Sequence, residues 1–210
     1  MTIKVQNQEE LNKALADNAS HIEIHSSSTE WLEAMVENPC ELSVHGSSRV
    51  MIYDAAKIAV FDDATVNVFG NGTVTANDQS KVAAYGDTRV LAYDKVKAEA
   101  YDRASVTAFD KTTVNAHDEA SVTCYDSASV VLHDDSAAVA YDVSMVTAKN
   151  SSTVTACGKS VVKARDTAQV VAYDHATVMA NDLARISAAG HCTIKMCGPG
   201  EGQLNMVYRS

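Results

Sequence analysis

The chain has 210 residues, with 17 lysines and arginines against 27 aspartates and glutamates, and a formal net charge of -10. This length fits one domain with a small cap. The acidic balance argues against binding nucleic acid through its phosphates, which requires a basic surface, and it favours a basic protein partner.

The N-terminal residues MTIKVQNQEE lack the basic and apolar regions of a secretory signal peptide. No apolar run approaches the ~18 residues that a membrane span needs. The cysteines are odd in number, irregularly spaced and without a CxxC pair, which predicts free thiols in a cytoplasmic protein rather than a disulfide framework or a zinc site. They are Cys40, Cys124, Cys157, Cys192 and Cys197.

Residues 1–41 do not repeat, and we expect them to form an N-terminal capping segment. The residues IKV at 3–5 and HIEI at 21–24 are typical of short strands. Asn7 is placed to cap a helix near residues 8–16. The sequence therefore predicts a small αβ cap.

A second apolar face follows within the same segment, and it consists of Trp31, Leu32, Met35 and Val36. Because the open end of a strand stack is an exposed sheet edge, we expect the segment to cover the first coil. It holds eight acidic and two basic residues, a net charge of -6, against -4 for residues 42–198.

From residue 42 to residue 198 the sequence repeats every eight residues without insertion or deletion. One position, here called the corner position, falls at residue 46 and at every eighth residue up to 198. Its twenty occupants are thirteen Asp, six Gly and Asn150. Four residues before it stands Val in fourteen repeats, two residues before it mostly Ala, and two residues after it a small residue.

This pattern alternates apolar and polar residues, which is typical of a strand. An eight-residue strand and corner cannot bury its own apolar face, but stacked units can. The sequence therefore predicts an all-β fold, a parallel β-solenoid or β-helix, over residues 42–198.

The residue just before the corner indicates how many strands make one coil. Alternate repeats carry Phe109, Tyr125, Tyr141, Cys157 and Tyr173, and the repeats between them carry His117, His133, Lys149, Arg165 and Asn181. This favours two strands in a sixteen-residue coil, about ten coils, and a stack roughly 45–50 Å long. A coil of three strands remains the alternative, and the handedness is open. The core is expected to be thin, and wider at the start and at Met196.

A position restricted to Asp, Asn and Gly is typical of a backbone with positive φ. Asp and Asn can also bond their own backbone in an Asx-turn. We therefore interpret each single corner Asp as a residue required by the geometry of the turn. The excess of Asp over Gly is consistent with an additional, collective role of these residues.

Residues 198–202, Gly-Pro-Gly-Glu-Gly, interrupt the repeat. The tail at 199–210 then carries Leu204, Met206, Val207 and Tyr208. It could fold back as a cap or pair with a second copy. We expect a homodimer or domain-swapped capping at this end.

No catalytic, metal or cofactor site is expected. Enzymes on β-helices build their clefts from loops between coils, and this repeat has no insertions. His117 and His133 would stack on neighbouring coils, but Lys149 and Arg165 continue their row and repel cations. Thr-x-Thr pairs occur at 73/75 and 153/155, but the equivalent positions in the repeats between them do not hold threonine regularly. This argues against ice binding, and Thr is common in strands in any case.

The remaining candidate is the acidic row. With two strands per coil, one corner carries Asp62, Asp78, Asp94, Asp110, Asp126 and Asp142 in successive coils, with Tyr93, Phe109, Tyr125 and Tyr141 beside them. The other corner carries Asp102, Asp118 and Asp134. Such a row resembles the charge spacing of DNA, and aromatic neighbours are typical of protein interfaces. Lys95, Arg103 and Lys111 are expected to soften the repulsion within it.

The repeat resembles that of octapeptide β-solenoid proteins of the pattern A-x-V-x-A-Y-D-x, as in "ASVTAFDK" and "AQVVAYDH". The resemblance covers residues 42–198 and implies the fold. In kind, though not in motif, it is also similar to the pentapeptide-repeat proteins, cytosolic rods of which some are acidic dimers that imitate DNA, and to acidic anti-CRISPR inhibitors.

These observations predict a non-enzymatic, acidic inhibitor of a nucleic-acid-processing enzyme, in the anti-CRISPR, anti-restriction or topoisomerase-inhibitor class. Its partner would be a protein with a basic nucleic-acid-binding surface, not nucleic acid or a membrane. The alternative is a structural or surface-recognition rod, such as a phage or cell-envelope spacer.

Overall fold

The computed structural model describes residues 2–54, 56–197 and 203–206, the last four by their backbone alone. The chain divides into an N-terminal unit, Met1–Val106, and a C-terminal unit, Thr107–Ser210. Apart from one nine-residue helix, the regular elements described in both units are strands of four or five residues. The fold class predicted from the repeat, all-β, is confirmed.

Each eight-residue repeat forms one strand and one corner. In β8 (Thr73–Ala76), Val74 and Ala76 are buried and Thr73 is exposed, because strand side chains alternate between faces. Val74 pairs in parallel with Ile58 on one side and Val90 on the other, sixteen residues away in each direction. A coil therefore holds two strands, which makes the fold a two-stranded parallel β-solenoid and excludes the three-stranded alternative.

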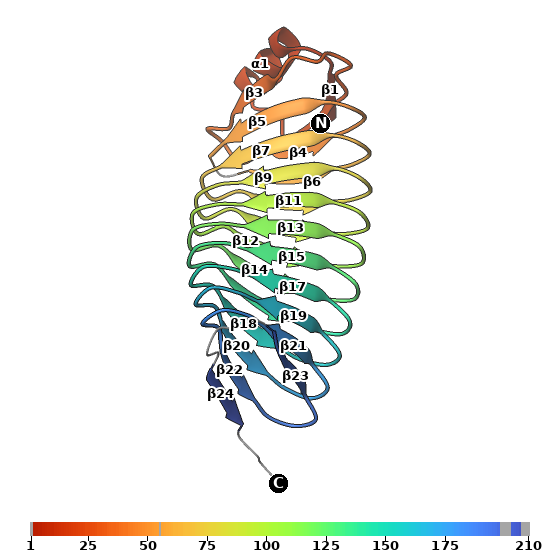
Figure 1. The fold of residues 1–210 in the computed structure, drawn as a ribbon. Helices are drawn as coiled ribbons and strands as arrows, with labels where there is room; N and C mark the ends of the chain where they lie inside the picture. Colours follow the sequence, from red (N-terminus) through yellow and green to blue (C-terminus); the bar gives the residue numbers. More distant parts are fainter. Residues whose placement is uncertain (1, 55, 198–202, 207–210) are drawn as a thin grey trace. The chain divides into compact units, whose positions relative to one another are not determined.

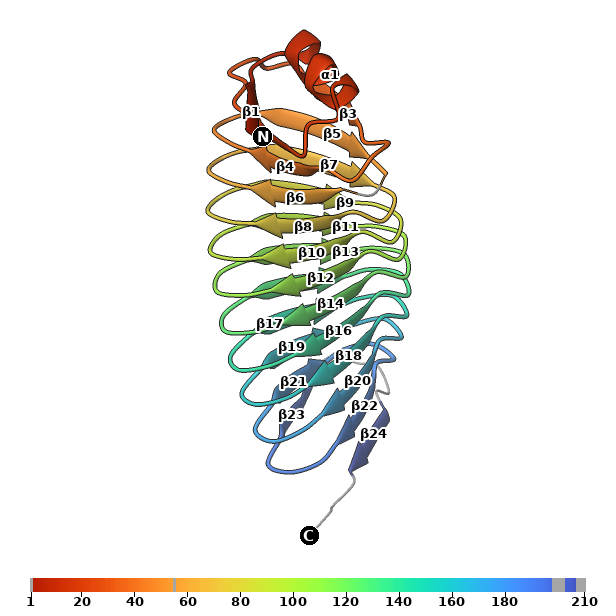
Figure 2. The ribbon, with the colours of Figure 1, turned by 180° about the vertical axis from the view of Figure 1, so that it is seen from behind.

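Two parallel sheets form the N-terminal unit, with strand orders β1-β2-β4-β6-β8-β10 and β3-β5-β7-β9-β11. Figure 1 shows the odd-numbered strands stacked one after another, and Figure 2 shows the even-numbered strands from behind. Besides β8, the strands are β1 (Thr2–Val5), β2 (His21–Ile24), β3 (Leu32–Met35), β4 (Glu41–Val44), β5 (Arg49–Tyr53), β6 (Lys57–Val60), β7 (Thr65–Phe69), β9 (Lys81–Ala84), β10 (Arg89–Ala92) and β11 (Lys97–Ala100).

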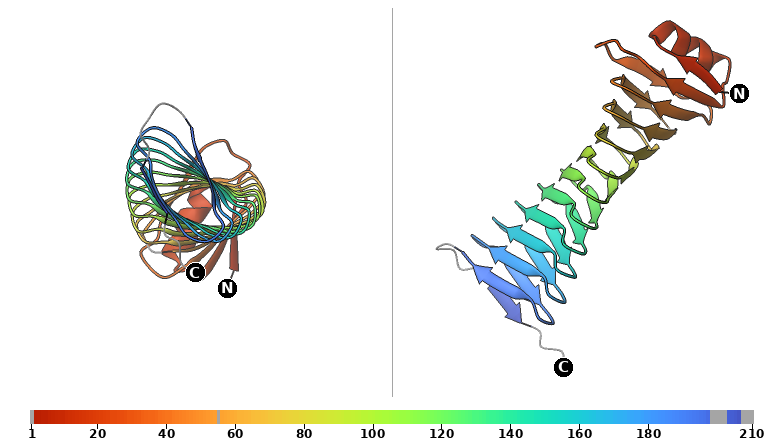
Figure 3. Two further views of the ribbon diagram at one scale, coloured as in Figure 1. Left: turned by 60° about the horizontal axis from the view of Figure 1, so that its bottom comes forward. Right: turned by 90° about the vertical axis from the view of Figure 1, so that its right-hand side faces the viewer.

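The C-terminal unit repeats this arrangement, with strand orders β14-β16-β18-β20-β22-β24 and β13-β15-β17-β19-β21-β23. Figure 3 shows the stacking within each unit from two further directions. The strands are β13 (Thr113–Ala116), β14 (Ser121–Cys124), β15 (Ser129–Leu132), β16 (Ala137–Ala140), β17 (Met145–Ala148), β18 (Thr153–Ala156), β19 (Val161–Ala164), β20 (Gln169–Ala172), β21 (Thr177–Ala180), β22 (Arg185–Ala188), β23 (Thr193–Met196) and β24 (Gln203–Met206). Strand β12 (Ser105–Ala108) contains the boundary between the units.

The core is thin, as expected, because Val and Ala fill its two inward positions. A third buried position follows each corner by two residues and holds small side chains, many of them hydroxylated. Ser80 Oγ donates to the Asn77 carbonyl at 2.8 Å, and Ser144 Oγ donates to the Tyr141 carbonyl at 2.6 Å. These bonds satisfy hydroxyl groups that would otherwise be costly to bury. Among the described side chains, Ser160 Oγ is buried without such a partner.

Residues 1–41 do more than cap the repeat. Strand β1 pairs with β2, β2 pairs with β4, and β3 pairs with β5, all in parallel, so this segment continues both sheets. The solenoid is consequently longer than the ten coils expected from residues 42–198, because the eight-residue spacing does not extend into the segment that adds these strands.

Helix α1 (Gln8–Ala16) packs on β1, β2 and β3 and buries Leu11 and Ala14. The predicted N-cap is confirmed, since Asn7 Oδ1 accepts the Glu10 backbone N–H at 3.0 Å. Gln8 Nε2 donates to the Glu33 carbonyl at 2.8 Å, and Gln8 Oε1 accepts the Glu33 N–H at 2.7 Å. Because β3 stands at the end of its sheet, this pair of bonds satisfies part of an exposed strand edge.

At the other end, β24 pairs in parallel with β22. Strand β23 ends its sheet, and its inward positions are poorly covered: Ile194 is half-buried and Met196 is 45% exposed. The sequence predicted a wider core at Met196, and this prediction is wrong. Met196 is not enclosed, because no strand described in the same sheet lies beyond β23. The tail residues 199–202 and 207–210 lie outside the described residues.

Candidate functional site

Every described corner residue has a positive φ. The values run from 54° to 72° for Asp and Asn, and from 65° to 103° for Gly. This is the left-handed region, which Gly adopts freely and which Asp and Asn tolerate better than other residues. The predicted geometric role of the corner position is confirmed.

The corner side chains also join successive coils. A carboxylate oxygen accepts a hydrogen bond from the backbone N–H of the corner residue sixteen positions earlier, at 2.9–3.4 Å, so the side chain bonds the preceding coil. Asn150 Oδ1 makes the same bond to the Asp134 N–H, at 3.2 Å. The acceptors include Asp62, Asp78, Asp94, Asp102, Asp126, Asp134, Asp142, Asp166, Asp174 and Asp182. This bond explains why Asp outnumbers Gly.

Each unit contains three residues of the predicted acidic row. Asp62, Asp78 and Asp94 follow β6, β8 and β10 on one corner of the N-terminal unit, and each is bonded to the next. On the corner that follows the even-numbered strands of the C-terminal unit, the same bonds join Asp110, Asp126 and Asp142. All six residues are exposed. A carboxylate has about four lone-pair sites, so it can accept further bonds from a partner.

The predicted aromatic residues lie beside these groups. Phe109, Tyr125 and Tyr141 stack, with ring centroids 5.2 and 5.0 Å apart and planes within 8°. Tyr93, half-buried, precedes Asp94 in the N-terminal unit. Tyr141 is exposed and Phe109 and Tyr125 are half-buried, so these rings remain partly accessible to a partner.

A second aromatic row in the N-terminal unit was missed. The rings of Tyr53, Phe69, Tyr85 and Tyr101 stack on the other corner, with centroids 4.7–5.0 Å apart. The sequence signal for this row is an aromatic residue that recurs every sixteen residues from Tyr53 to Tyr101.

Residues 110–142 concentrate the charge. Five consecutive corner positions are Asp in this block, and Glu119 and Asp135 add two carboxylates. Its one lysine or arginine is Lys111, so the block has a net charge of -6. The corner residues are Asp110, Asp118, Asp126, Asp134 and Asp142, all exposed. The whole C-terminal unit has a net charge of -3, so the block is far more acidic than its surroundings.

Arg103, one of the cations expected to soften the row, pairs instead with Asp87 at 3.0 Å. Both residues directly follow corner positions on the corner opposite to Asp94. Both side chains are more than half exposed, so the pair adds little stability.

An apolar patch adjoins Asp142. Val143 and Met145 are 57% and 45% exposed, and Tyr141 is also exposed. Met145 pairs in register with Val161 on β19. Both Val143 and Met145 occupy outward positions that are polar in most repeats, and that departure is the sequence signal that was overlooked. Exposed apolar side chains beside charges are typical of protein interfaces.

The histidine and threonine candidates gain no support. His117 and His133 stack with centroids 4.7 Å apart, and no cluster of three metal-binding side chains occurs among the described residues. On the outer face of β14–β20, Thr123, Val139, Thr155 and Val171 follow one another in register. Alternating threonine and valine do not form a uniform threonine array.

Comparisons with protein-family models, curated proteins and solved structures found no match to this chain. In the part of the chain that is described, no helix is long and apolar enough to cross a membrane.

Proposed function

We propose that this protein is a non-enzymatic inhibitor that occupies the basic, nucleic-acid-binding surface of a nucleic-acid-processing enzyme. The observation that carries the proposal is the acidic block at residues 110–142, where the corner bonds hold exposed carboxylates in a repeating array. Its class would be that of DNA-mimicking anti-CRISPR, anti-restriction or topoisomerase inhibitors, built here on an octapeptide repeat.

The spacing of the charges supports this assignment. Parallel strands lie ~4.8 Å apart, so a carboxylate at both corners of every coil places about one negative charge per 2.4 Å along the stack. Duplex DNA carries one charge per ~1.7 Å of its axis. The two densities are of the same order, so lysines and arginines that receive phosphates could receive this array.

The neighbouring side chains supply what charge alone lacks. Exposed Tyr141 within the block, and exposed Val143 and Met145 directly after it, offer apolar area to a partner. Tyrosine and methionine are enriched in protein interfaces, where buried apolar contacts contribute much of the affinity. The target is therefore a protein rather than a free basic peptide of random sequence.

Replacing a corner Asp by Asn removes the charge and keeps the corner geometry, because Asn150 has both the positive φ and the bond to the preceding coil. The test is a triple variant, Asp110→Asn, Asp126→Asn and Asp142→Asn, used as bait in host lysate and washed with increasing salt. The matched control replaces Asp166, Asp174 and Asp182 by Asn, which removes equal charge from the same position of the repeat in the same unit.

We expect the unaltered protein and the control to capture a nuclease, topoisomerase or CRISPR effector that moderate salt releases and duplex DNA displaces. The first triple variant should lose that capture. Equal capture by all three proteins would refute the proposal and return the corner aspartates to a purely geometric role. A second triple, with Asp62, Asp78 and Asp94 replaced by Asn, tests the row in the N-terminal unit.

The alternative, a structural or surface-recognition rod, has one observation in its favour. Strand β23 ends its sheet, with Met196 exposed and Ile194 only half-buried. Such an end invites assembly of many copies end to end, whereas assembly limited to two copies fits the proposed inhibitor. Polymerisation, or binding to cell envelopes or glycans without a soluble partner, would favour this alternative.

A further inference from the structure

The N-terminal unit contains two hollows that lie along helix α1. One, of about 540 Å³, is lined on the helix side by Leu15 and Ala16 and across from them by Glu37 and Pro39. The other, of about 520 Å³, is lined by residues that include Trp31 and Glu33. Both hollows are lined by Asn12 and Met35, so they adjoin each other at these two side chains.

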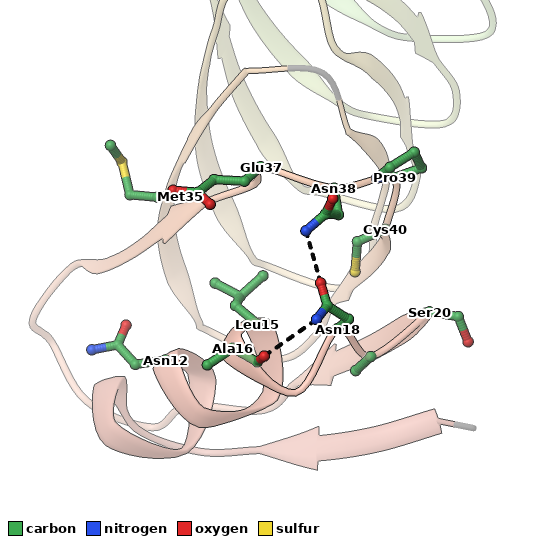
Figure 4. Close-up of a pocket in the computed structure, with 11 residues that line it drawn as sticks. Asn12, Leu15, Ala16, Asn18, Ser20, Met35, Glu37, Asn38, Pro39 and Cys40 are labelled. Atoms are coloured by element: carbon green, nitrogen blue, oxygen red, sulfur yellow. Dashed lines mark hydrogen bonds between the residues drawn. The ribbon is translucent and has the colours of Figure 1, made fainter.

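Figure 4 shows the first hollow, with Leu15 pointing from the helix toward the segment that carries Glu37 and Asn38. Asn38 Nδ2 donates to Asn18 Oδ1 at 2.7 Å, which ties this segment to the end of the helix. Gln8 ties β3 to the start of the helix through its two bonds to Glu33. These bonds fix the segments that line the hollows to both ends of the helix. Binding of a ligand therefore costs less conformational entropy, because less of the lining has to be ordered.

Apolar side chains are available where the hollows adjoin. Met35 is 58% exposed, because the alternation of β3 turns it outward while Leu32 and Ala34 face the core. Trp31, the one tryptophan of the chain, and Leu15 are half-buried. Tryptophan and methionine are residue types that protein interfaces favour as anchors.

The surroundings are acidic. Residues 30–41 contain four glutamates and no lysine or arginine. Glu41 is paired with Lys57, whereas Glu30, Glu33 and Glu37 are exposed and take part in none of the ion pairs between described residues. An exposed apolar side chain in hollows that are also lined by exposed carboxylates is complementary to an apolar side chain flanked by basic ones.

We infer that the two hollows along α1 form a docking groove for a basic, amphipathic peptide segment of a protein partner. An apolar side chain of the segment covers Met35 and contacts Trp31 and Leu15, and its lysines or arginines pair with Glu30, Glu33 and Glu37. This inference rests on the proposed function for the basic nature of the partner. It assigns a surface in the N-terminal unit that is separate in sequence from the acidic block.

Trp31 provides the test, because its fluorescence reports directly on the groove. The full-length protein is titrated with a synthetic peptide of alternating lysine and leucine, and with the same peptide after lysine acetylation. We expect a saturable shift of the emission for the first peptide and none for the second. Two variants should each raise the dissociation constant of the peptide about tenfold or more. They are Met35→Ser and, separately, the triple variant Glu30→Gln, Glu33→Gln and Glu37→Gln.

Leu183→Ser is the matched control, because Leu183 is also an exposed apolar residue, 60% exposed, and lies in the other unit outside the acidic block and the patch beside it. It should leave peptide binding unchanged. Absence of a saturable shift, or equal losses for Met35→Ser and Leu183→Ser, would overturn the inference. The Asn triple at positions 110, 126 and 142 should bind the peptide normally, so a failure of the groove and a failure of the proposed function give different results.

Discussion

Asp78 accepts a hydrogen bond from the backbone N–H of Asp62 at 3.0 Å, although the two residues are sixteen positions apart in the sequence. Both have left-handed backbone, with φ values of 60° and 59°. The conformation turns the chain at the corner, and the carboxylate then satisfies an N–H on the neighbouring coil. One residue type thus serves both the turn and the stacking of the coils.

This dual role predicts an order of stability at Asp126, which accepts the Asp110 N–H. Asp126→Asn should change the free energy of unfolding little, because asparagine keeps the acceptor. Asp126→Gly should cost about 1 kcal/mol for the lost bond. Asp126→Ala should cost roughly 1–2 kcal/mol more than glycine, because alanine is strained at positive φ. Urea unfolding measures the series, and equal stability of the Asn and Ala variants would contradict it.

Two corner glycines should respond oppositely to asparagine. A Cβ at Gly86 would lie 2.7 Å from the Gly70 carbonyl oxygen, so Gly86→Asn should cost about 1–3 kcal/mol. A Cβ at Gly158 would lie 3.1 Å from the Asp142 nitrogen, where an asparagine could add the missing bond between coils. Gly158→Asn should be neutral or stabilising. Thermal unfolding of both variants checks this. A larger loss of stability for Gly158→Asn than for Gly86→Asn would contradict the role of the corner bond between coils.

Ser144 and Ser160 occupy the same buried position in adjacent coils, but only Ser144 has a hydrogen-bond partner among the described residues. Ser144→Ala should lower the free energy of unfolding by about 1 kcal/mol. Ser160→Ala should be neutral or stabilising by about 1 kcal/mol, because it removes a buried hydroxyl without a partner. Denaturant titrations measure both variants, and equal destabilisation would show that Ser160 also makes a necessary bond.

Burial raises the pKa of the Cys124 thiol to about 11 from its ordinary value of 9.0. The folded state therefore holds this proton more tightly than the unfolded state, and the stabilisation is complete below pH 9. It should be lost as pH rises from 9 to 11, by roughly 2–3 kcal/mol.

The measurement for Cys124 is the free energy of unfolding against pH, in reductant, for the unaltered protein and for Cys124→Ala. Alanine is the usual residue at this position of the repeat, so the variant should fold. The difference between the two curves isolates Cys124 from the other titrating groups. A difference that stays constant between pH 8 and pH 11 would show that the thiol is not protected by burial.

The exposed end at β23 predicts a homodimer. We expect light scattering after gel filtration to give twice the mass of 22.4 kDa, and Met196→Glu to give the monomer, because a buried charge at that contact would be unpaired. Val143→Glu, at another exposed apolar residue, is the control and should stay dimeric. A monomeric unaltered protein, or dissociation by both variants, would contradict dimerisation at this end.

Much of the fold was predictable because the repeat is uninterrupted. Position by position, the sequence predicted buried Val and Ala, the left-handed corners, the two-stranded coil and the helix capped by Asn7. The bond from each corner carboxylate to the preceding coil was not predicted, because it joins residues sixteen apart. Local turn preferences describe a single corner and contain no information about the backbone N–H of the corner on the preceding coil.

The candidate surface divides in the same way. The corner aspartates and the aromatic residues beside them were evident from their spacing, whereas Val143, Met145 and the groove along α1 were not. Outward exposure of Met35 depends on how β3 joins the sheet, and residues 1–41 lack the repeat that would have fixed its register.

The sequence by itself determined the strand and the corner of each repeat, because an eight-residue period with a position that only Asp, Asn and Gly occupy specifies where the chain extends and where it turns. The tertiary structure decided which groups meet between coils and at the ends of the sheets. Those contacts depend on stacking in three dimensions, where residues distant in sequence come within hydrogen-bonding distance, and no local preference encodes them.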